Sequence, residues 1–310
     1  MLAYFWLLLG LIVMIISGNW LVSGSVQLAR HFKISTLVVG LTIVAYGTST
    51  PEIFIGIKAA LSGSHDIALG NVIGSNIANI ACILAIVALI CPIPLRNRSI
   101  GFDLMMMFFV TLLLLIFGYN GVITFYEGIF LIAILIAYTA WLVVKSKRQT
   151  ASDENIEATM KPLRAVLMIL ASIVGLYFSS GWFVDGAREL ALQWGVSERV
   201  IGISIVAVGT SMPELITSLI AALKKEGDLS VGNIIGSNFF NIAGVLGVTA
   251  TVRSLNISNH TLFINDMMWL FGISLAFLLT MLPLSKGKIN RWEAALLLSL
   301  FAVYMVVLYN

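Results

Sequence analysis

The chain has 310 residues, of which 59% are hydrophobic and only 11% are charged. Soluble domains average about a quarter charged residues, so this composition excludes a water-soluble fold. The 18 Lys and Arg against 15 Asp and Glu leave a net charge of +3, which gives no reason to expect a nucleic-acid partner. The two cysteines and three histidines lack metal-ligand spacing, so neither a Cys- or His-based metal centre nor any other cofactor is expected.

Apolar segments of roughly 20 residues, each long enough to cross about 30 Å of hydrocarbon as a helix, follow one another along the chain. Five precede a polar stretch at 145–161 and five follow it. The sequence therefore predicts an all-α polytopic membrane protein with ten transmembrane helices: a first group at 1–144, a linker at 145–161 and a second group at 162–310. The expected spans are 2–25, 38–60, 67–91, 102–119, 123–144, 163–187, 200–222, 229–252, 262–282 and 292–309.

The cations predict the orientation of these spans. When the connections are assigned alternately to the two sides of the membrane, 14 Lys and Arg fall on one side and 4 on the other. Connections on the cytoplasmic side carry the excess of Lys and Arg. We therefore expect a multi-pass protein of the cell membrane, with the linker at 145–161 in the cytoplasm and both termini outside.

The sequence contains an internal repeat. Residues 39–86 align without a gap with residues 201–248 at an offset of 162, and 23 of the 48 pairs are identical. Each group has an odd number of spans, so the second copy enters the membrane from the opposite side. The predicted fold is thus two inverted five-helix repeats related by a pseudo-two-fold axis in the membrane plane. Secondary transporters often have this architecture, with the substrate site at the midplane between the repeats.

The strongest identity within the repeat falls on polar and helix-breaking residues in the middle of a span, GTSTPE at 47–52 and GTSMPE at 209–214. Pro removes a backbone donor and Gly loosens the helix, so each span is expected to open and free several carbonyls. Glu52 and Glu214 lie in these breaks, where an ionisable residue is costly and is a functional candidate by default. Carboxylate, hydroxyl and carbonyl oxygens without thiolate or imidazole favour a hard-cation site.

The following span of each copy adds a polar helix face, GNVIGSNIAN at 70–79 and GNIIGSNFFN at 232–241. Ser75 and Asn79 are four residues apart and share a face, as do Ser237 and Asn241. Their glycines form small-xxx-small pairs that let each helix approach a neighbour closely. Asn71 and Asn233 lie one turn earlier on the same faces, where they bind ions or only bridge helices.

Two copies of GTS-x-PE, each followed by GN-x-x-GSN, resemble the α-repeats of the sodium/calcium exchanger family within the calcium/cation antiporters, and the compact chain is similar to prokaryotic members. The resemblance implies that Na⁺ and Ca²⁺ are the transported ions and that the first two spans of each half slide as a gate. Asn241 stands where several relatives carry Asp, so the implied site has two formal charges. The oxygen ligands that the resemblance implies come from Ala45, Thr48, Ser49, Glu52, Ser75, Asn79, Ala207, Thr210, Ser211, Glu214, Ser237 and Asn241.

The expected function is therefore a secondary antiporter that exchanges Na⁺ for Ca²⁺ by alternating access, with inorganic cations and the lipid bilayer as partners and no obligate protein partner. A Ca²⁺/H⁺ or other cation/proton antiporter stays open, because Glu52 and Glu214 can also carry protons. A cation channel is disfavoured, since channels usually build a pore about an axis normal to the membrane. An enzyme is not expected, because the spans contain no Ser–His or Asp–Asp catalytic arrangement.

Overall fold

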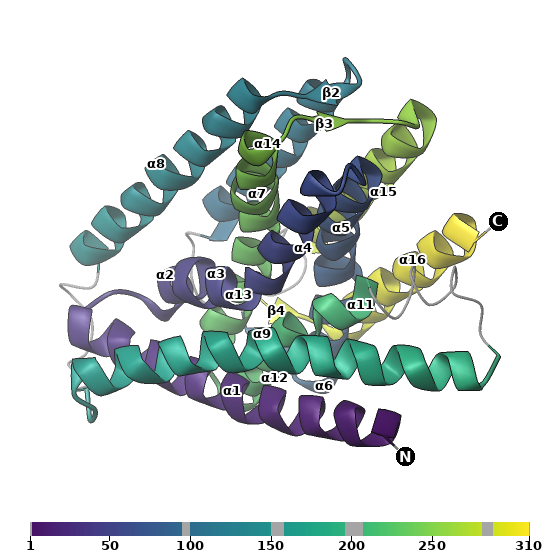
Figure 1. Cartoon of the computed structure of the whole chain (residues 1–310). Helices are drawn as coiled ribbons and strands as arrows, with labels where there is room; N and C mark the ends of the chain where they lie inside the picture. The colour runs from purple at the N-terminus through teal and green to yellow at the C-terminus, as the bar shows by residue number, and fades with distance from the viewer. Residues whose placement is uncertain (1, 95–99, 150–157, 196–206, 281–287, 310) are drawn as a thin grey trace.

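The computed structural model describes residues 2–94, 100–149, 158–195, 207–280 and 288–309, which form helices joined by short connections (Figure 1). The first half contains α1 (Leu2–Phe32), α2 (Thr36–Val39), η1 (Gly40–Val44), α3 (Ala45–Thr48), α4 (Thr50–Leu61), α5 (His65–Ala78), η2 (Asn79–Leu84), α6 (Ala85–Ile90), α7 (Ile100–Gly118) and α8 (Phe125–Gln149), where η denotes a π-helical segment. The second half contains α9 (Pro162–Gln193), α11 (Ala207–Thr210), α12 (Met212–Leu223), α13 (Gly227–Phe240), η5 (Asn241–Leu246), α14 (Gly247–Val252), α15 (His260–Thr280) and α16 (Arg291–Tyr309).

The sequence repeat extends to the boundaries of the elements. In the pairs α3 and α11, α4 and α12, α5 and α13, η2 and η5, and α6 and α14, both ends differ by the offset of 162 residues. The same holds for two short strands, β1 (Ile93–Pro94) and β3 (Leu255–Asn256). Equivalent residues of the two halves therefore occupy equivalent places in the secondary structure.

Among the described residues, eight helices are long and apolar enough to cross a membrane, and a bent pair, Thr36–Thr48 with Thr50–Leu61, makes up to nine. The expected span at 200–222 lies partly outside the described residues, which include α11 and α12 from it. The chain is thus a multi-pass helical membrane protein. Its α8 continues to Gln149, five residues beyond the predicted end of the first group.

The two most buried spans occupy the centre of the molecule. Inside His65–Ile90, 78% of the most apolar window is buried, and inside Gly227–Val252 the figure is 89%, whereas the other spans range from 22% to 39%. The outer spans carry exposed large apolar side chains such as Leu8, Ile136 and Leu167, as lipid-facing helices do. The polar motifs at 70–79 and 232–241 are therefore held in the interior rather than at the lipid surface.

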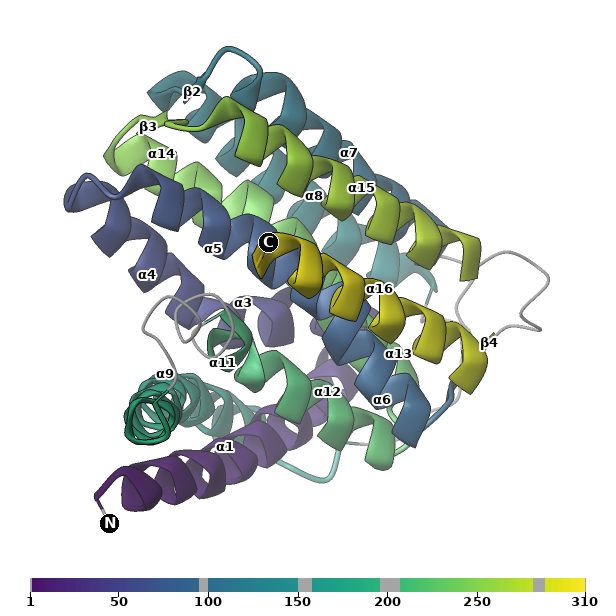
Figure 2. The ribbon, with the colours of Figure 1, turned by 90° about the vertical axis from the view of Figure 1, so that its right-hand side faces the viewer.

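Helices α1 and α9 lie side by side along one edge of the molecule (Figures 1 and 2). A Cβ added to Gly24 would lie 3.0 Å from the carbonyl oxygen of Ala165, and one added to Gly186 would lie 2.6 Å from the backbone nitrogen of Leu7. The early part of each helix thus contacts the late part of the other, so the pair is antiparallel. Only small residues permit this approach of two backbones.

Glycines also set the packing of α13, as expected for the second copy of the motif. A Cβ on Gly232 would lie 2.6 Å from the carbonyl oxygen of Leu37, and one on Gly236 would lie 2.5 Å from that of Leu41. For Gly70 and Gly74, no described atom lies within 4 Å of such a Cβ. The close approach brings α13 against η1 and α3, and so against the motif at 47–52.

Two antiparallel strand pairs tie the connections of one half to those of the other. Strand β1 pairs with β4 (Lys288–Ile289), with Ile93 opposite Ile289, and β2 (Val122–Ile123) pairs with β3, with Ile123 opposite Leu255. The four apolar residues at these registers are buried. Each pair therefore joins a connection of the first half to one of the second.

Candidate ion-binding site

Each copy of the GTS-x-PE motif interrupts a helix, as predicted. Helix α3 ends at Thr48 and α4 begins at Thr50, with Ser49 between them at φ −85°, ψ 14° and a bend of 46°. Pro51 falls in the first turn of α4, where its missing N–H is tolerated, but it leaves the carbonyl of Gly47 without the donor that an unbroken helix would supply. In the second copy Ser211 has φ −90°, ψ 7° before α12.

Glu52 and Glu214 lie in the first turns of α4 and α12, at helix N-termini that favour negative charge. Both side chains are 0% exposed and interact electrostatically with each other. The hydroxyl of Ser49 donates to Oε1 of Glu214 at 2.9 Å, a contact between the two halves. Both carboxylate oxygens of Glu52 and Oε2 of Glu214 have no hydrogen-bond partner among the described residues. Buried charges without partners are costly, and a bound cation would satisfy them.

Thr48 joins the first motif to α13. Its hydroxyl donates to the carbonyl of Ala45 at 3.2 Å, and it lies 3.4 Å from the hydroxyl of Ser237 and 3.3 Å from Oδ1 of Asn233. All four residues are buried. A carbonyl, two hydroxyls and an amide oxygen thus meet beside the interrupted helix.

Asn71 and Asn233 bridge helices. The Nδ2 of Asn71 donates to the backbone carbonyl of Glu52 at 3.4 Å, and that of Asn233 donates to the carbonyl of Glu214 at 3.5 Å and to the hydroxyl of Ser218 at 2.8 Å. Each asparagine therefore fixes the polar helix of its own half to the residue that carries the carboxylate. This geometry supports the bridging alternative.

The polar helices change to π-helical winding at the predicted ligands Asn79 and Asn241, the first residues of η2 and η5. Such segments are rare and are frequent at functional sites. Both asparagines are 0% exposed, and Oδ1 of Asn241 and both amide atoms of Asn79 have no partner among the described residues.

Hydrogen bonds join some of the expected ligands to one another, whereas others share only their burial in the interior. Contacts join Ser49 to Glu214 and Thr48 to Ala45 and Ser237. Ser75, Thr210 and Ser211 are buried, and Ser211 has no partner for its hydroxyl among the described residues. The side chain of Ala207 lies outside the described part of the chain.

Sequence reasoning did not select Asn76, Asn238 and Ser218, which all take part in the buried hydrogen-bond network. Asn76 and Asn238 were visible as an identical pair at the offset of 162 within GSN. Ser218 has no such signal, because its counterpart in the first copy is Gly56.

The atoms available to bind a cation at this site are oxygens. No group of three or more His, Cys, Asp or Glu that could hold a metal ion occurs among the described residues. Carboxylate, hydroxyl, amide and carbonyl oxygens bind Na⁺ and Ca²⁺ in preference to softer metals. When both carboxyl groups are ionised, they carry two negative charges, which balance one divalent or two monovalent cations.

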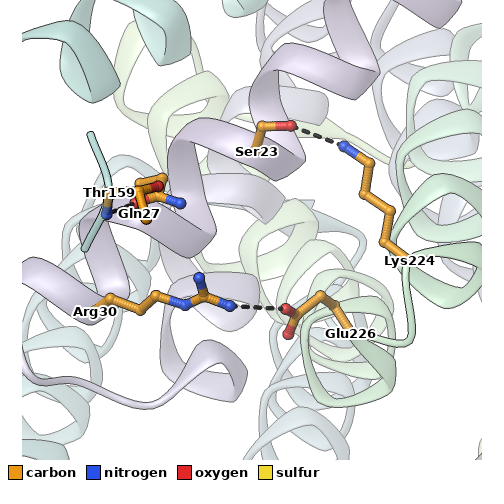
Figure 3. Close-up of polar contacts among 6 residues, drawn as sticks. All are labelled: Ser23, Gln27, Arg30, Thr159, Lys224 and Glu226. Carbon is orange, nitrogen blue, oxygen red and sulfur yellow. Dashed lines mark hydrogen bonds and ion pairs between the residues drawn. The ribbon is translucent and has the colours of Figure 1, made fainter. Parts of the chain in front are cut away.

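A second polar cluster connects the C-terminal part of α1, which carries Arg30, to neighbouring segments (Figure 3). The Nζ of Lys224 donates to the hydroxyl of Ser23 at 2.8 Å, and Arg30 lies 3.8 Å from the carboxylate of Glu226. Burial raises the pKa of Glu226, and the guanidinium of Arg30 opposes that shift. Gln27 accepts hydrogen bonds from the backbone of Thr159 and Met160. The contacts of Ser23 and Arg30 join α1 to the turn between α12 and α13, and those of Gln27 join it to the segment that precedes α9.

Comparison with known families identifies the chain. The sequence profile described as sodium/calcium exchanger protein matches residues 2–144 and 164–310. The chain belongs to the sodium/calcium exchanger family. This membership confirms the resemblance of the two repeated motifs.

Full-length relatives agree with this family. The chain is 36% identical to CaxA of Alkalimonas amylolytica over 99% of both proteins. It is 28% identical to the sodium/calcium exchanger MaX1 of Methanosarcina acetivorans, over 98% of this chain and 97% of that protein. It also matches the solved structure of the sodium-calcium exchanger NCX_Mj with a TM-score of 0.84 and 32% identity, over 99% of this chain and 98% of that one. The family member described here is thus a membrane antiporter of the cation/Ca²⁺ class.

Proposed function

We propose that this exchanger moves Na⁺ in one direction and Ca²⁺ in the other by alternating access to the site around Glu52 and Glu214. The observation that carries the proposal is the pair of fully buried, interacting carboxylates, three of whose four oxygens have no partner among the described residues. Charges in such a place need a counter-charge, and no described Lys or Arg forms an ion pair with them. Transported cations meet that requirement.

The geometry and the family membership support a ligand set made of oxygen atoms. Its first members are the two carboxylates, the Ala45 carbonyl and the hydroxyls of Thr48, Ser49 and Ser237. Hydrogen bonds join Ser49 to Glu214, and Thr48 to Ala45 and Ser237, while both carboxylate oxygens of Glu52 have no partner among the described residues. Na⁺ and Ca²⁺ compete for these oxygens, so loading one ion displaces the other. The remaining proposed ligands are Ser75, Asn79, Ala207, Thr210, Ser211 and Asn241.

Alternating access requires two halves that exchange roles. In our proposal residues 1–144 and 162–310 are inverted repeats joined by a cytoplasmic linker at 145–161. The antiparallel packing of α1 against α9, which begin the two halves, supports this inversion. In the conformation described here, the contacts of Ser23 and Arg30 with the α12–α13 turn connect α1 to the second half (Figure 3).

Sodium-driven calcium flux tests the proposed function. The purified protein, reconstituted into liposomes loaded with Na⁺ and diluted into Na⁺-free medium, is expected to accumulate ⁴⁵Ca²⁺, because outward Na⁺ movement supplies the driving force. Liposomes with equal Na⁺ on both sides are the control. Uptake that follows an imposed pH gradient and ignores the Na⁺ gradient would instead establish a Ca²⁺/H⁺ antiporter.

Cysteine labelling tests the orientation that the charge distribution predicts. In a Cys82→Ala and Cys91→Ala background, a cysteine at Ala151 is expected to resist an impermeant thiol reagent in intact cells, because the linker is cytoplasmic. A cysteine at Asn310 is expected to react, because the C-terminus lies outside. Permeabilised cells, in which both sites should react, provide the control, and the reverse pattern in intact cells would show that the orientation is inverted.

A further inference from the structure

Four buried asparagines, two from each half, surround the contact between α5 and α13. Asn76 and Asn79 correspond to Asn238 and Asn241 at the offset of 162, and all four side chains are at most 1% exposed. The Nδ2 of Asn241 donates to Oδ1 of Asn76 at 3.0 Å, and the Nδ2 of Asn76 donates to the backbone carbonyl of Asn238 at 3.2 Å. Asn76 therefore holds the amide of Asn241 and the backbone of α13 at once.

The equivalent bonds on the other side are absent, although the residues are the same. The repeat predicts a bond from Nδ2 of Asn79 to Oδ1 of Asn238, yet both of these atoms lack a partner among the described residues. The Nδ2 of Asn238 instead turns back to the carbonyl of Ile234 in its own helix, at 2.8 Å. Asn241 and Asn76 are thus joined by a hydrogen bond, whereas their counterparts, Asn79 and Asn238, are not.

This difference matters for a cation, because an amide can present either its oxygen or its NH₂ group and only the oxygen attracts positive charge. The bond to Asn76 uses the Nδ2 of Asn241 and leaves Oδ1 buried and available. No such bond fixes Asn79, whose two amide atoms are both unpartnered among the described residues. In this conformation a hydrogen bond fixes the amide of Asn241 and leaves its oxygen without a partner, whereas no described hydrogen bond fixes the amide of Asn79.

We propose that Asn76 and Asn238 are positioning residues that form an alternating amide switch between the two repeats. Asn76 orients Asn241 in the conformation described here. In the conformation open to the opposite side, Asn238 orients Asn79 through the equivalent bond, and the bond between Asn76 and Asn241 breaks. The inference rests on the proposed exchange function and adds two residues that support the ion ligands without binding ions themselves.

The exchange of partners conserves the number of these bonds, so the switch favours neither conformation. An alternating carrier needs this balance, because a bond made only on one side would trap the protein in that state. A structural role for Asn76, limited to packing α5 against α13 through its bond to Asn238, would give no such alternation. The two roles therefore predict different responses to substitution.

Double-mutant cycles on the two pairs, measured with ⁴⁵Ca²⁺ from each face of oriented membrane vesicles, test the switch. Asn76→Ala is expected to weaken apparent Ca²⁺ affinity about tenfold at one face, because an unpaired Asn241 is free to rotate. In an Asn241→Ala background the same change should cost less than about twofold. Asn238→Ala should act at the opposite face, and its effect should vanish in an Asn79→Ala background.

Asn76→Leu, which keeps the branched shape without the amide, replaces the alanine variant if the latter is not monodisperse. Additive cycles, or effects of Asn76 and Asn238 at the same face, would overturn the switch while leaving the exchange function intact. Failure of the exchange function is recognised separately, in the parent protein. A parent that neither transports ⁴⁵Ca²⁺ nor gains thermal stability from added Ca²⁺ or Na⁺ would overturn both.

Discussion

Replacing Glu52 or Glu214 with Gln is expected to abolish Na⁺-driven ⁴⁵Ca²⁺ uptake by this exchanger. Each change keeps the shape of the side chain but removes one of the two negative charges in a fully buried site. A single charge pair at about 4 Å is worth on the order of 4 kcal/mol at an effective dielectric of about 20. The loss for a divalent ion therefore corresponds to at least about a hundredfold in apparent affinity. Uptake into proteoliposomes at several Ca²⁺ concentrations measures this loss of apparent affinity.

Asp103→Asn provides a matched control for this loss. Asp103 is also a fully buried carboxyl within a span, but it lies in α7 and accepts a hydrogen bond from Tyr138 at 2.7 Å. An Asn at this position can still accept that bond, so folding and transport should both survive. Near-normal Ca²⁺ uptake by either glutamine variant would remove the two carboxylates from the proposed mechanism, whatever the control does.

The sequence was sufficient to predict the class of fold and the interruption of two helices. Long apolar segments must cross the bilayer as helices, and Pro51, which follows Gly47 by four residues, disrupts the helical hydrogen bonding, so the break before Glu52 follows from local chemistry. The exact residue of the break, Ser49, is set by where the new helix can begin around Pro51. The repeat also accounts for the equal boundaries of the paired elements in the two halves, because the same local sequence occurs twice.

Contacts between distant residues could not be predicted in the same way. The bond from Ser49 to Glu214 joins positions 165 residues apart, and no local pattern encodes it. The repeat also implies equal roles for Asn79 and Asn241, whereas the structure gives the amide of Asn241 a hydrogen-bond partner and that of Asn79 none among the described residues. In any single conformation of an alternating-access transporter, the two repeats differ from each other. A sequence repeat gives the residues of both repeats, but it does not determine which of the equivalent hydrogen bonds is formed.

The resemblance to the sodium/calcium exchanger family implies an Asp in several members where this chain has Asn241, and Asn241→Asp is expected to make transport dependent on pH. The substitution changes the volume little and raises the formal charge of the site from −2 to −3. Three carboxylates in one buried site repel one another, so uptake of a proton becomes favourable when no cation is bound. The variant also loses the N–H that Asn241 donates to Oδ1 of Asn76. Two acceptor oxygens would then face each other, which again favours a proton between them.

The expected result is tighter apparent Ca²⁺ binding at high pH and a progressive loss at low pH, because protons compete with Ca²⁺ for the added carboxylate. Initial rates of ⁴⁵Ca²⁺ uptake from about pH 6 to 9, at fixed Na⁺ gradient, measure both effects. Asn79→Asp is the matched control, since it adds the same charge at the equivalent position without removing a hydrogen bond. Its pH dependence should be weaker, because no acceptor pair forms beside it. If Asn241→Asp instead equals the parent in apparent Ca²⁺ affinity and in pH profile, Asn241 lies outside the ion site.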